Sequence, residues 1–314
     1  MRAPGKCVST FRDGIGAVLR PPRPTARSLF LAAFLAAGLL AGTASAANAK
    51  VPRLIFPVVG SASYINDFNS PRGNGRHGAT DIMAPKRSLA VAAEAGRVKF
   101  WTTSWRAGCM LYLEGVSGTE YLYIHLNNDK TLKNDNQGGC KTGTSYARGL
   151  KSGDQVEAGE PVGYVGDSGD ADGIASHLHF EVHPGGGAEV NPFPHLNRAR
   201  RLLFAAPFGS PFTLSLNGTV VEASDGTLAL DVDLLRRYPG GLRVPEVGRK
   251  VELSVPPNVV VLNPVGALIA AAQLAAAEAG QEATVWTQRA ETTLAAQLGT
   301  PLLLAAAKIQ LKSG

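Results

Sequence analysis

The segment from residue 176 to residue 182, Ser-His-Leu-His-Phe-Glu-Val, constrains the fold of this chain more than any other. Side chains along an extended strand alternate between two faces. His177 and His179 therefore share one face, while Leu178, Phe180 and Val182 share the other. An apolar row opposite a polar row is typical of a strand with one face in a core. The segment thus predicts a half-buried strand that presents two imidazoles together.

A second pair of potential ligands lies about a hundred residues earlier. His77 and Asp81 are spaced i,i+4 and offer the nitrogen and oxygen ligands that zinc accepts. Three protein ligands leave a fourth position for water, which is the arrangement of a catalytic zinc site. We therefore expect metal-assisted chemistry where these two segments meet.

Residues 1–46 have the layout of a secretory signal. A basic stretch precedes an apolar run of about 13 residues, and Ala44-Ser45-Ala46 fits the small-x-small cleavage pattern. The run is short for a roughly 30 Å hydrocarbon core, which needs about 20 residues, although an uncleaved membrane anchor is the alternative. No Cys follows the run, so lipid attachment at a new N-terminus is not expected. We expect a secreted or cell-envelope protein, periplasmic or in the cell wall, without a membrane partner after signal removal.

The net charge of the chain comes mostly from this leader. The whole chain carries a formal charge of +6, and the leader holds six Lys/Arg and one acidic residue, Asp13. The remaining chain keeps 25 basic and 24 acidic side chains, a net charge of +1. No concentrated basic face is evident, so nucleic acid is not an expected partner.

Two of the three cysteines, Cys109 and Cys140, remain after the leader and its Cys7 are removed. An even pair in an exported chain favours a disulfide, with two free buried thiols as the alternative. The disulfide would close a loop of about 31 residues, worth roughly 3–4 kcal/mol in the chain-entropy model.

The first predicted domain covers residues 52–200 and is mainly β. Strands are expected at residues 91–101, 110–115, 120–126, 156–165 and 177–182, separated by loops rich in Gly, Asp, Asn and Ser. Few stretches have helical periodicity, so we predict a compact antiparallel β-sheet domain. Residues 127–149 are polar and predict an exposed loop, either a wall of the substrate site or a disordered insertion.

The second predicted domain covers residues 204–314 and contains neither His nor Cys. Strands are expected at residues 212–223, 227–234, 250–255, 283–288 and 302–311, and one short helix at 266–279. Asp225-Gly226 is a hairpin signal. The pattern predicts a smaller, β-barrel-like accessory domain that binds, spaces or stabilises and does not catalyse.

Together, the motifs of the first domain resemble one family. The segment 76–82, Arg-His-Gly-Ala-Thr-Asp-Ile, resembles the His-x-x-x-Asp motif of the lysostaphin-type (LytM-like) zinc metalloendopeptidases that act on peptidoglycan. Residues 123–126 (Tyr-Ile-His-Leu), the Gly-rich stretch 153–166, the strand 176–182 and the stretch 190–192 (Val-Asn-Pro) are similar to further motifs of that family, in the same order. The resemblance covers residues 56–196.

The resemblance implies one zinc ion per chain held by His77, Asp81 and His179, with His125 and His177 as the unliganded catalytic pair. One position departs from the family, which usually has Gly where this chain has Ala79. The extra methyl predicts a slightly altered loop and an intact metal site. The long loop after His125 leaves substrate width and specificity open.

The implied chemistry agrees with the residues. A zinc ion lowers the pKa of bound water to about 7, and imidazoles with pKa values near 6.5 can move its proton to a leaving amine. The division of roles between His125 and His177 is open. Glu181 is either a partner that orients a ligand or a solvent-facing carboxylate. His183 is expected in a loop, and His195 at the surface.

These observations favour an exported zinc endopeptidase that hydrolyses amide bonds in the peptide part of peptidoglycan. A non-catalytic wall-binding or hydrolase-activating module of the same fold is the main alternative, but all five motif positions are present. A zinc D-Ala-D-Ala carboxypeptidase spaces its first ligands more widely, and its Glu-bearing motif is absent, as is a His-Glu-x-x-His segment.

Overall fold

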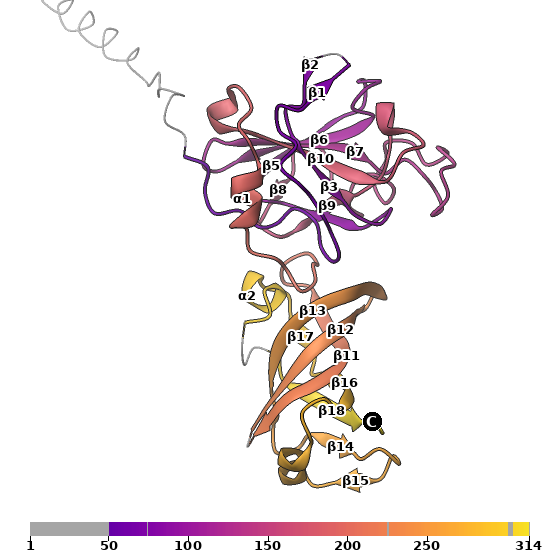
Figure 1. Ribbon diagram of the computed structural model, residues 1–314, viewed down its shortest axis with the longest axis vertical. Coiled ribbons are helices and arrows are strands. Elements are labelled where there is room, and N and C mark those ends of the chain that lie inside the picture. The colour runs from indigo at the N-terminus through magenta and orange to yellow at the C-terminus, as the bar shows by residue number, and fades with distance from the viewer. Residues whose placement is uncertain (1–49, 74, 225, 301–303, 314) are drawn as a thin grey trace, which may run out of the picture. The chain divides into compact units, whose positions relative to one another are not determined.

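The computed structural model describes residues 50–73, 75–224, 226–300 and 304–313. The predicted signal segment, Cys7 and Asp225 of the predicted turn lie outside these residues. Among the described residues, no helix has the length and apolar character needed to cross a membrane. The chain is mainly β, with a compact antiparallel domain followed by a smaller β-rich domain, as predicted (Figure 1). The boundaries assigned to the two domains stay predictions.

A six-stranded antiparallel sheet forms the centre of the first domain. Its strands, in spatial order, are β3 (Thr80–Met83), β10 (His177–His183), β7 (Glu120–Leu126), β6 (Cys109–Gly115), β5 (Gly96–Trp101) and β8 (Gln155–Val156). Strand β10 lies between β3 and β7, with His179 paired to Asp81 on one side and to Ile124 on the other. The pairing therefore brings both predicted ligand segments to adjacent strands.

Alternation along β10 places its apolar side chains in the core. Leu178, Phe180 and Val182 are fully buried, and they share one cluster with Tyr121 and Tyr123 of β7. Burying a large apolar side chain stabilises a fold by about 1.5–3 kcal/mol. The core therefore fixes the strand register, and a fixed register holds His177 and His179 on the opposite face.

Two small sheets flank this one. Strands β4 (Leu89–Val91) and β9 (Pro161–Tyr164) pair with each other, and β1 (Pro71–Arg72) pairs with β2 (Gly75–Arg76). The predicted strands 91–101 and 156–165 are each divided into two elements in different sheets. Between β8 and β9, Gly159 has φ of +90°. This left-handed backbone interrupts the strand predicted at 156–165 and turns the chain.

Short helical turns follow the sheet strands. They are η2 (Gly169–Ala171), η3 (Pro184–Gly186) and α1 (Phe193–Asn197). His183 is the last residue of β10, so its predicted loop position is wrong, because Pro184 ends the strand one residue later. His195 lies half-buried in α1.

The predicted exposed loop at residues 127–149 is only partly exposed. Asn127, Asp129, Ser145 and Tyr146 are buried within it. Asp129 accepts hydrogen bonds from two main-chain amides of the loop, and its other oxygen lies 2.6 Å from Lys86 Nζ. The predicted Cys109–Cys140 disulfide is formed and ties the loop to β6. Buried polar groups need such partners, and these fold the segment onto the domain.

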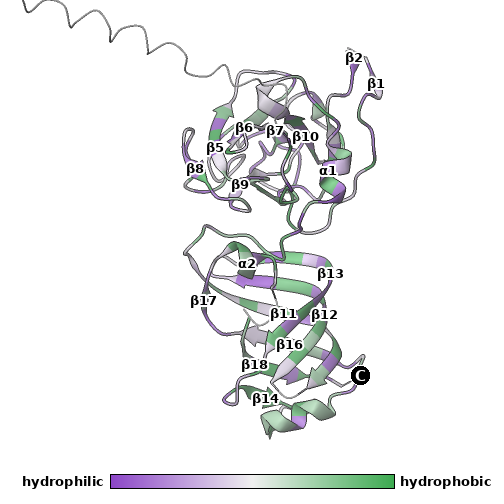
Figure 2. Cartoon of the chain, turned by 90° about the vertical axis from the view of Figure 1, so that its left-hand side faces the viewer, coloured by the Kyte–Doolittle hydropathy of each residue, from purple (hydrophilic) through white to green (hydrophobic). Residues whose placement is uncertain are grey.

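The second domain is one eight-stranded sheet. Its strands are β11 (Pro211–Ser224), β12 (Thr227–Tyr238), β13 (Leu242–Ser254), β14 (Val260–Leu262), β15 (Leu268–Ile269), β16 (Glu282–Thr287), β17 (Ala290–Glu291) and β18 (Ala306–Leu311). Bands of apolar and polar residues alternate along β11–β13, as expected for a sheet with one buried face (Figure 2).

This sheet has the barrel-like character that the sequence predicts. Strands β13, β12, β11, β16 and β18 lie side by side, and a bridge between Ser254 and Ala305 joins the end of β13 to the start of β18. The predicted helix at 266–279 is wrong, because the structure has β15 and a 3-10 segment, η4 (Ala271–Ala276), there. Within η4 only Leu274 is buried, too little apolar surface to stabilise an α-helix by packing. The last short helix is α2 (Leu294–Gln297).

Candidate metal centre

Three predicted ligand residues converge on one point of the open sheet face. His77 Nε2 lies 3.0 Å from Asp81 Oδ1 and 3.1 Å from His179 Nδ1, and the last two atoms are 3.0 Å apart. Asp81 and His179 come from the paired strands β3 and β10, and His77 comes from the turn before β3. Their ligand atoms thus form a nearly equilateral triangle.

Each of these residues is held from behind by a further partner. His77 Nδ1 lies 3.1 Å from the main-chain oxygen of Asp67, and His179 Nε2 lies 3.1 Å from Glu181 Oε1. Arg72 donates from Nη2 to Asp81 Oδ2 at 2.8 Å. A hydrogen on the outer nitrogen of each imidazole leaves the inner nitrogen with a free lone pair. The outer contacts therefore favour the tautomers that a cation requires.

Glu181 is the orienting partner, which resolves the two alternatives for this residue. Its second oxygen lies 2.7 Å from His183 Nε2. Burial would raise the pKa of Glu181, but hydrogen bonds from His179 and His183 lower it to about 2. The carboxylate therefore stays ionised at neutral pH and keeps His179 oriented.

The donor set fits a zinc ion. Two imidazole nitrogens and one carboxylate oxygen are zinc ligands, and they form the one such group found among the described residues. A tetrahedral ion with bonds of about 2.0–2.1 Å sets neighbouring ligand atoms about 3.3 Å apart. The observed separations of 3.0–3.1 Å need to widen by only a few tenths of an ångström.

The two remaining predicted residues, His125 and His177, lie beside this triangle. Their ring centroids are 5.1 Å apart, and the ring of His125 is 5.6 Å from that of His179. His125 Nδ1 donates to the carbonyl of Ser168 at 2.8 Å, and His177 Nδ1 donates to that of Ala175 at 2.9 Å. In the neutral form of either ring, Nε2 is then the nitrogen without a proton.

The charge state of His125 follows from its surroundings. Burial, together with the nearby His179 and His177, lowers the pKa of His125 to about 4. The imidazole is therefore neutral near pH 7 and available as a proton acceptor.

All five predicted residues line one cavity of about 510 Å³. Three arginines, Arg72, Arg76 and Arg106, also line it. A concave site with converging polar groups is the arrangement expected of a substrate pocket. The assignment of roles to the five residues remains a prediction that the geometry supports.

Sequence reasoning missed three groups at this site. Arg72 in β1 and Asp67 in the loop before it contact ligands from a segment without a recognisable motif, and Ser168 holds His125 through its main-chain oxygen. No periodicity marks such contacts, and a main-chain contact leaves no side-chain signal. Ala79, the departure from the family motif, is fully buried, and the ligand triangle is intact around it.

Comparisons with known proteins agree with the predicted family. Residues 129–192, which include His177 and His179, match the model described as "Peptidase family M23". An L-Ala–D-Glu endopeptidase of Bacillus subtilis (strain 168) is 27% identical over 162 residues, which are 46% of this chain and 43% of that protein.

Two solved structures are also similar. The catalytic domain of the antimicrobial peptidase lysostaphin from Staphylococcus simulans has a TM-score of 0.33 and 21% identity, covering 44% of this chain and 92% of that one. A zinc-containing peptidase from Vibrio cholerae has a TM-score of 0.32 and 20% identity, covering 45% of this chain and 39% of that one.

This chain spans less than half the length of the curated relative that it matches. The family model nevertheless covers the strand that carries His177 and His179, one of the motifs that carry the resemblance. The first domain therefore resembles the LytM-like peptidases of family M23, as the sequence predicts.

Proposed function

We propose that this chain is an exported zinc endopeptidase that hydrolyses peptide bonds in bacterial peptidoglycan. One observation carries the proposal. Three ligand atoms converge within 3.1 Å of one another, and the imidazoles of His125 and His177 lie beside them in the same cavity. The B. subtilis relative is an L-Ala–D-Glu endopeptidase, which supports a peptide as the substrate class.

His77, Asp81 and His179 would hold the zinc. When bound, zinc polarises the substrate carbonyl and makes water a better nucleophile at neutral pH. The cavity beside the ion-binding triangle is large enough for a peptide segment, so the scissile bond can lie against the ligand face.

In this proposal His125 and His177 transfer the protons. Each holds its Nδ1 proton on a main-chain carbonyl, so each presents Nε2 as an acceptor. One imidazole takes the proton of the attacking water as the new C–O bond forms. A proton then passes to the amide nitrogen as the C–N bond breaks, and the products are a carboxylate and a new amine. The other imidazole, when protonated, stabilises the negative charge on the carbonyl oxygen.

Export is part of the same proposal. The predicted signal at residues 1–46 supports it, and a disulfide between Cys109 and Cys140 is characteristic of proteins in oxidising compartments. The substrate lies in the same space.

The function is tested with purified protein, bound-metal analysis and release of new amines from purified cell walls. The wild type is expected to bind one zinc ion and release amines, and a chelator should stop the release. His177→Ala should keep the metal and lose about 10²–10⁴-fold in kcat, because it removes a general acid–base group. His179→Ala should lose the metal as well.

His195→Ala is the matched control, since His195 lies in α1 and does not line the cavity. It should keep both zinc and activity. A His177→Ala variant with the full wild-type rate would contradict the role given to His177. Wild-type protein that binds zinc, binds cell walls and releases no amine would instead indicate the non-catalytic module.

A further inference from the structure

His125 lies in a strained part of strand β7. Cys109 pairs with Leu126 and Leu111 pairs with Tyr123, so two residues of β7 face one of β6 between these rungs. His125 is one of the two, and its φ is +61°, in the left-handed region. A residue other than Gly is strained in this region and persists there only where its surroundings hold it. Bulges commonly redirect a side chain near an active site.

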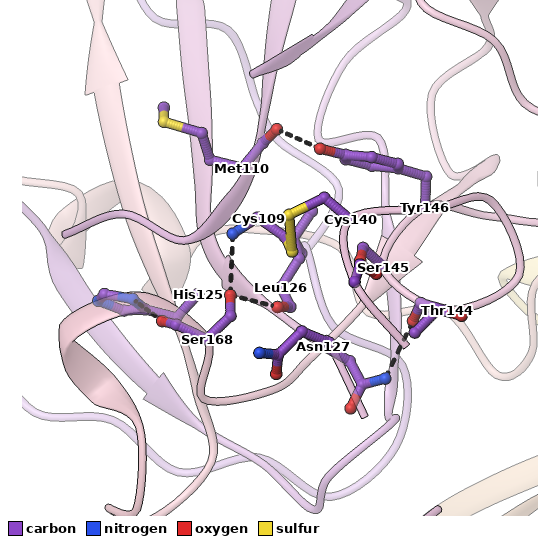
Figure 3. Close-up of a disulfide and its surroundings, with 12 residues drawn as sticks. Cys109, Met110, His125, Leu126, Asn127, Cys140, Thr144, Ser145, Tyr146 and Ser168 are labelled. Atoms are coloured by element: carbon purple, nitrogen blue, oxygen red, sulfur yellow. Dashed lines mark hydrogen bonds between the residues drawn. A yellow bond between two sulfur atoms is a disulfide. The ribbon is translucent and has the colours of Figure 1, made fainter. Parts of the chain in front are cut away.

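Ser168 is the residue that holds this bulge (Figure 3). Its hydroxyl accepts from the amide of Cys109 at 2.9 Å and donates to the carbonyl of Leu126 at 2.6 Å. Cys109 and Leu126 form the rung at the edge of the bulge. The hydroxyl therefore bridges the two strands where the bulge interrupts their ladder.

The main chain of Ser168 contacts His125 itself. Its carbonyl accepts the Nδ1 hydrogen at 2.8 Å, inside the buried interior of the domain. One residue thus bonds to the ring of His125 and to both strands beside the bulge. Ser168 is fully buried, so water does not compete for these bonds.

The segment around Ser168 has little freedom to move. A Cβ on Gly108 would collide with Ser168 Oγ, and a Cβ on Gly169 would collide with the carbonyl of Arg106. The amide of Asp170 donates to that same carbonyl at 2.9 Å. Because Gly108 and Gly169 have no side chains, the backbone of the turn before β6 packs directly against the backbone around Ser168.

We propose that Ser168 is a positioning residue for His125. Its carbonyl fixes the proton on Nδ1, and its hydroxyl fixes the bulge that directs Nε2 into the cavity. This inference rests on the proposed function, in which Nε2 of His125 acts on substrate.

Ser168→Ala is the direct test, with Ser145→Ala as a matched control. Both serines are fully buried and lie near the disulfide (Figure 3). Among the described residues, Ser145 Oγ donates to the Gly139 carbonyl alone, at 3.0 Å. Ser168→Ala should lower kcat by about 10–100-fold, a part of the general acid–base contribution. KM should change less than about threefold, and one zinc ion should stay bound. Ser145→Ala should keep kcat within about threefold.

Nitrogen NMR of the histidine rings provides a readout that does not depend on activity. Wild-type His125 should be the neutral Nδ1–H tautomer, with a slowly exchanging ring hydrogen. Ser145→Ala should keep this signal, and Ser168→Ala should exchange it at least about tenfold faster. A wild-type His125 protonated on Nε2 would overturn the inference, even if Ser168→Ala did not fold.

Equal kcat values for the two variants, with an active wild type, would also overturn it and leave the proposed function standing. A wild type that releases no amine would refute the proposed function. The NMR comparison would then still decide whether Ser168 holds His125.

Discussion

Arg72 contacts the oxygen of Asp81 that faces away from the ligand triangle. The Nη2–Oδ2 distance is 2.8 Å, and Arg72 Nη2 also lies 3.5 Å from Asp67 Oδ2. Partners of this kind orient a ligand before the ion arrives, and their loss commonly costs 10–100-fold in metal affinity. Arg72 is thus expected to stabilise the metal site without being a ligand.

Arg72→Gln should weaken zinc binding by about 10–100-fold, because Asp81 loses its orienting partner. Titration against a competing chelator measures the affinity. Arg76→Gln is the matched control, since Arg76 also lines the cavity but donates to the carbonyl of Asn69. Equal zinc affinities for the two variants would show that Arg72 does not orient Asp81.

At the residue scale, the sequence predicts side chains that follow a period or a motif. His177 and His179 share a face because strand geometry alternates, and His77 and Asp81 are marked by their spacing. Arg72 and Ser168 escape prediction for a physical reason. Their contacts depend on the path of β1 and of the segment around Ser168 in the folded domain, which no period or motif marks.

At the element scale, Lys86 joins two segments that lead to the site. Its Nζ lies 2.6 Å from Asp129 Oδ2 and 2.9 Å from Asp167 Oδ2, and all three side chains are largely buried. Burial would raise the pKa of Asp129, but Lys86 and the amides of Asn136 and Asp135 lower it. Burial raises the pKa of Asp167 in spite of Lys86.

Lys86→Met should lower the free energy of unfolding by about 3–5 kcal/mol at pH 7, because it leaves two buried carboxylates without their cation. Urea unfolding measures the loss. Lys99→Met is the control, because Lys99 is exposed on β5 and forms no ion pair with the described residues.

The pH dependence of this loss has a definite sign. Asp129 has a lowered pKa in the folded state, so its contribution is present above pH 3.8 and is lost as pH falls through the folded value. Lys86 has a raised pKa, so its contribution is present below pH 10.5 and is lost above the folded value. The difference between wild type and Lys86→Met should therefore shrink in strong acid and in strong base. A pH-independent difference would contradict the ion-pair account.

Elements were predictable where a period extends over several residues. β7 and β10 have the expected bounds to within one residue. The helix expected at 266–279 was inferred from Ala and Leu content, but propensity alone does not stabilise a segment with one buried side chain. The bulge at His125 was not predictable, because its left-handed backbone is imposed by Ser168 and not by local sequence.

At the scale of the whole molecule, the disulfide closes the loop that covers residues 109–140. In the chain-entropy model this loop is worth about 3–4 kcal/mol. Replacing both cysteines by Ala should lower the free energy of unfolding by about that amount, as measured by urea unfolding. Reduction of the wild type should give a similar loss. An unchanged stability would show that contacts within residues 127–149 suffice to order the loop.

Cys109 forms the disulfide with Cys140, and its main-chain amide donates to the hydroxyl of Ser168. Before oxidation, the strand beside His125 lacks one of its anchors, so newly made protein should be a slower enzyme than the oxidised form. If the chain is exported as proposed, completion of the active site would coincide with arrival outside the cytoplasm. A cell could synthesise such a hydrolase without exposing its interior to a fully competent one.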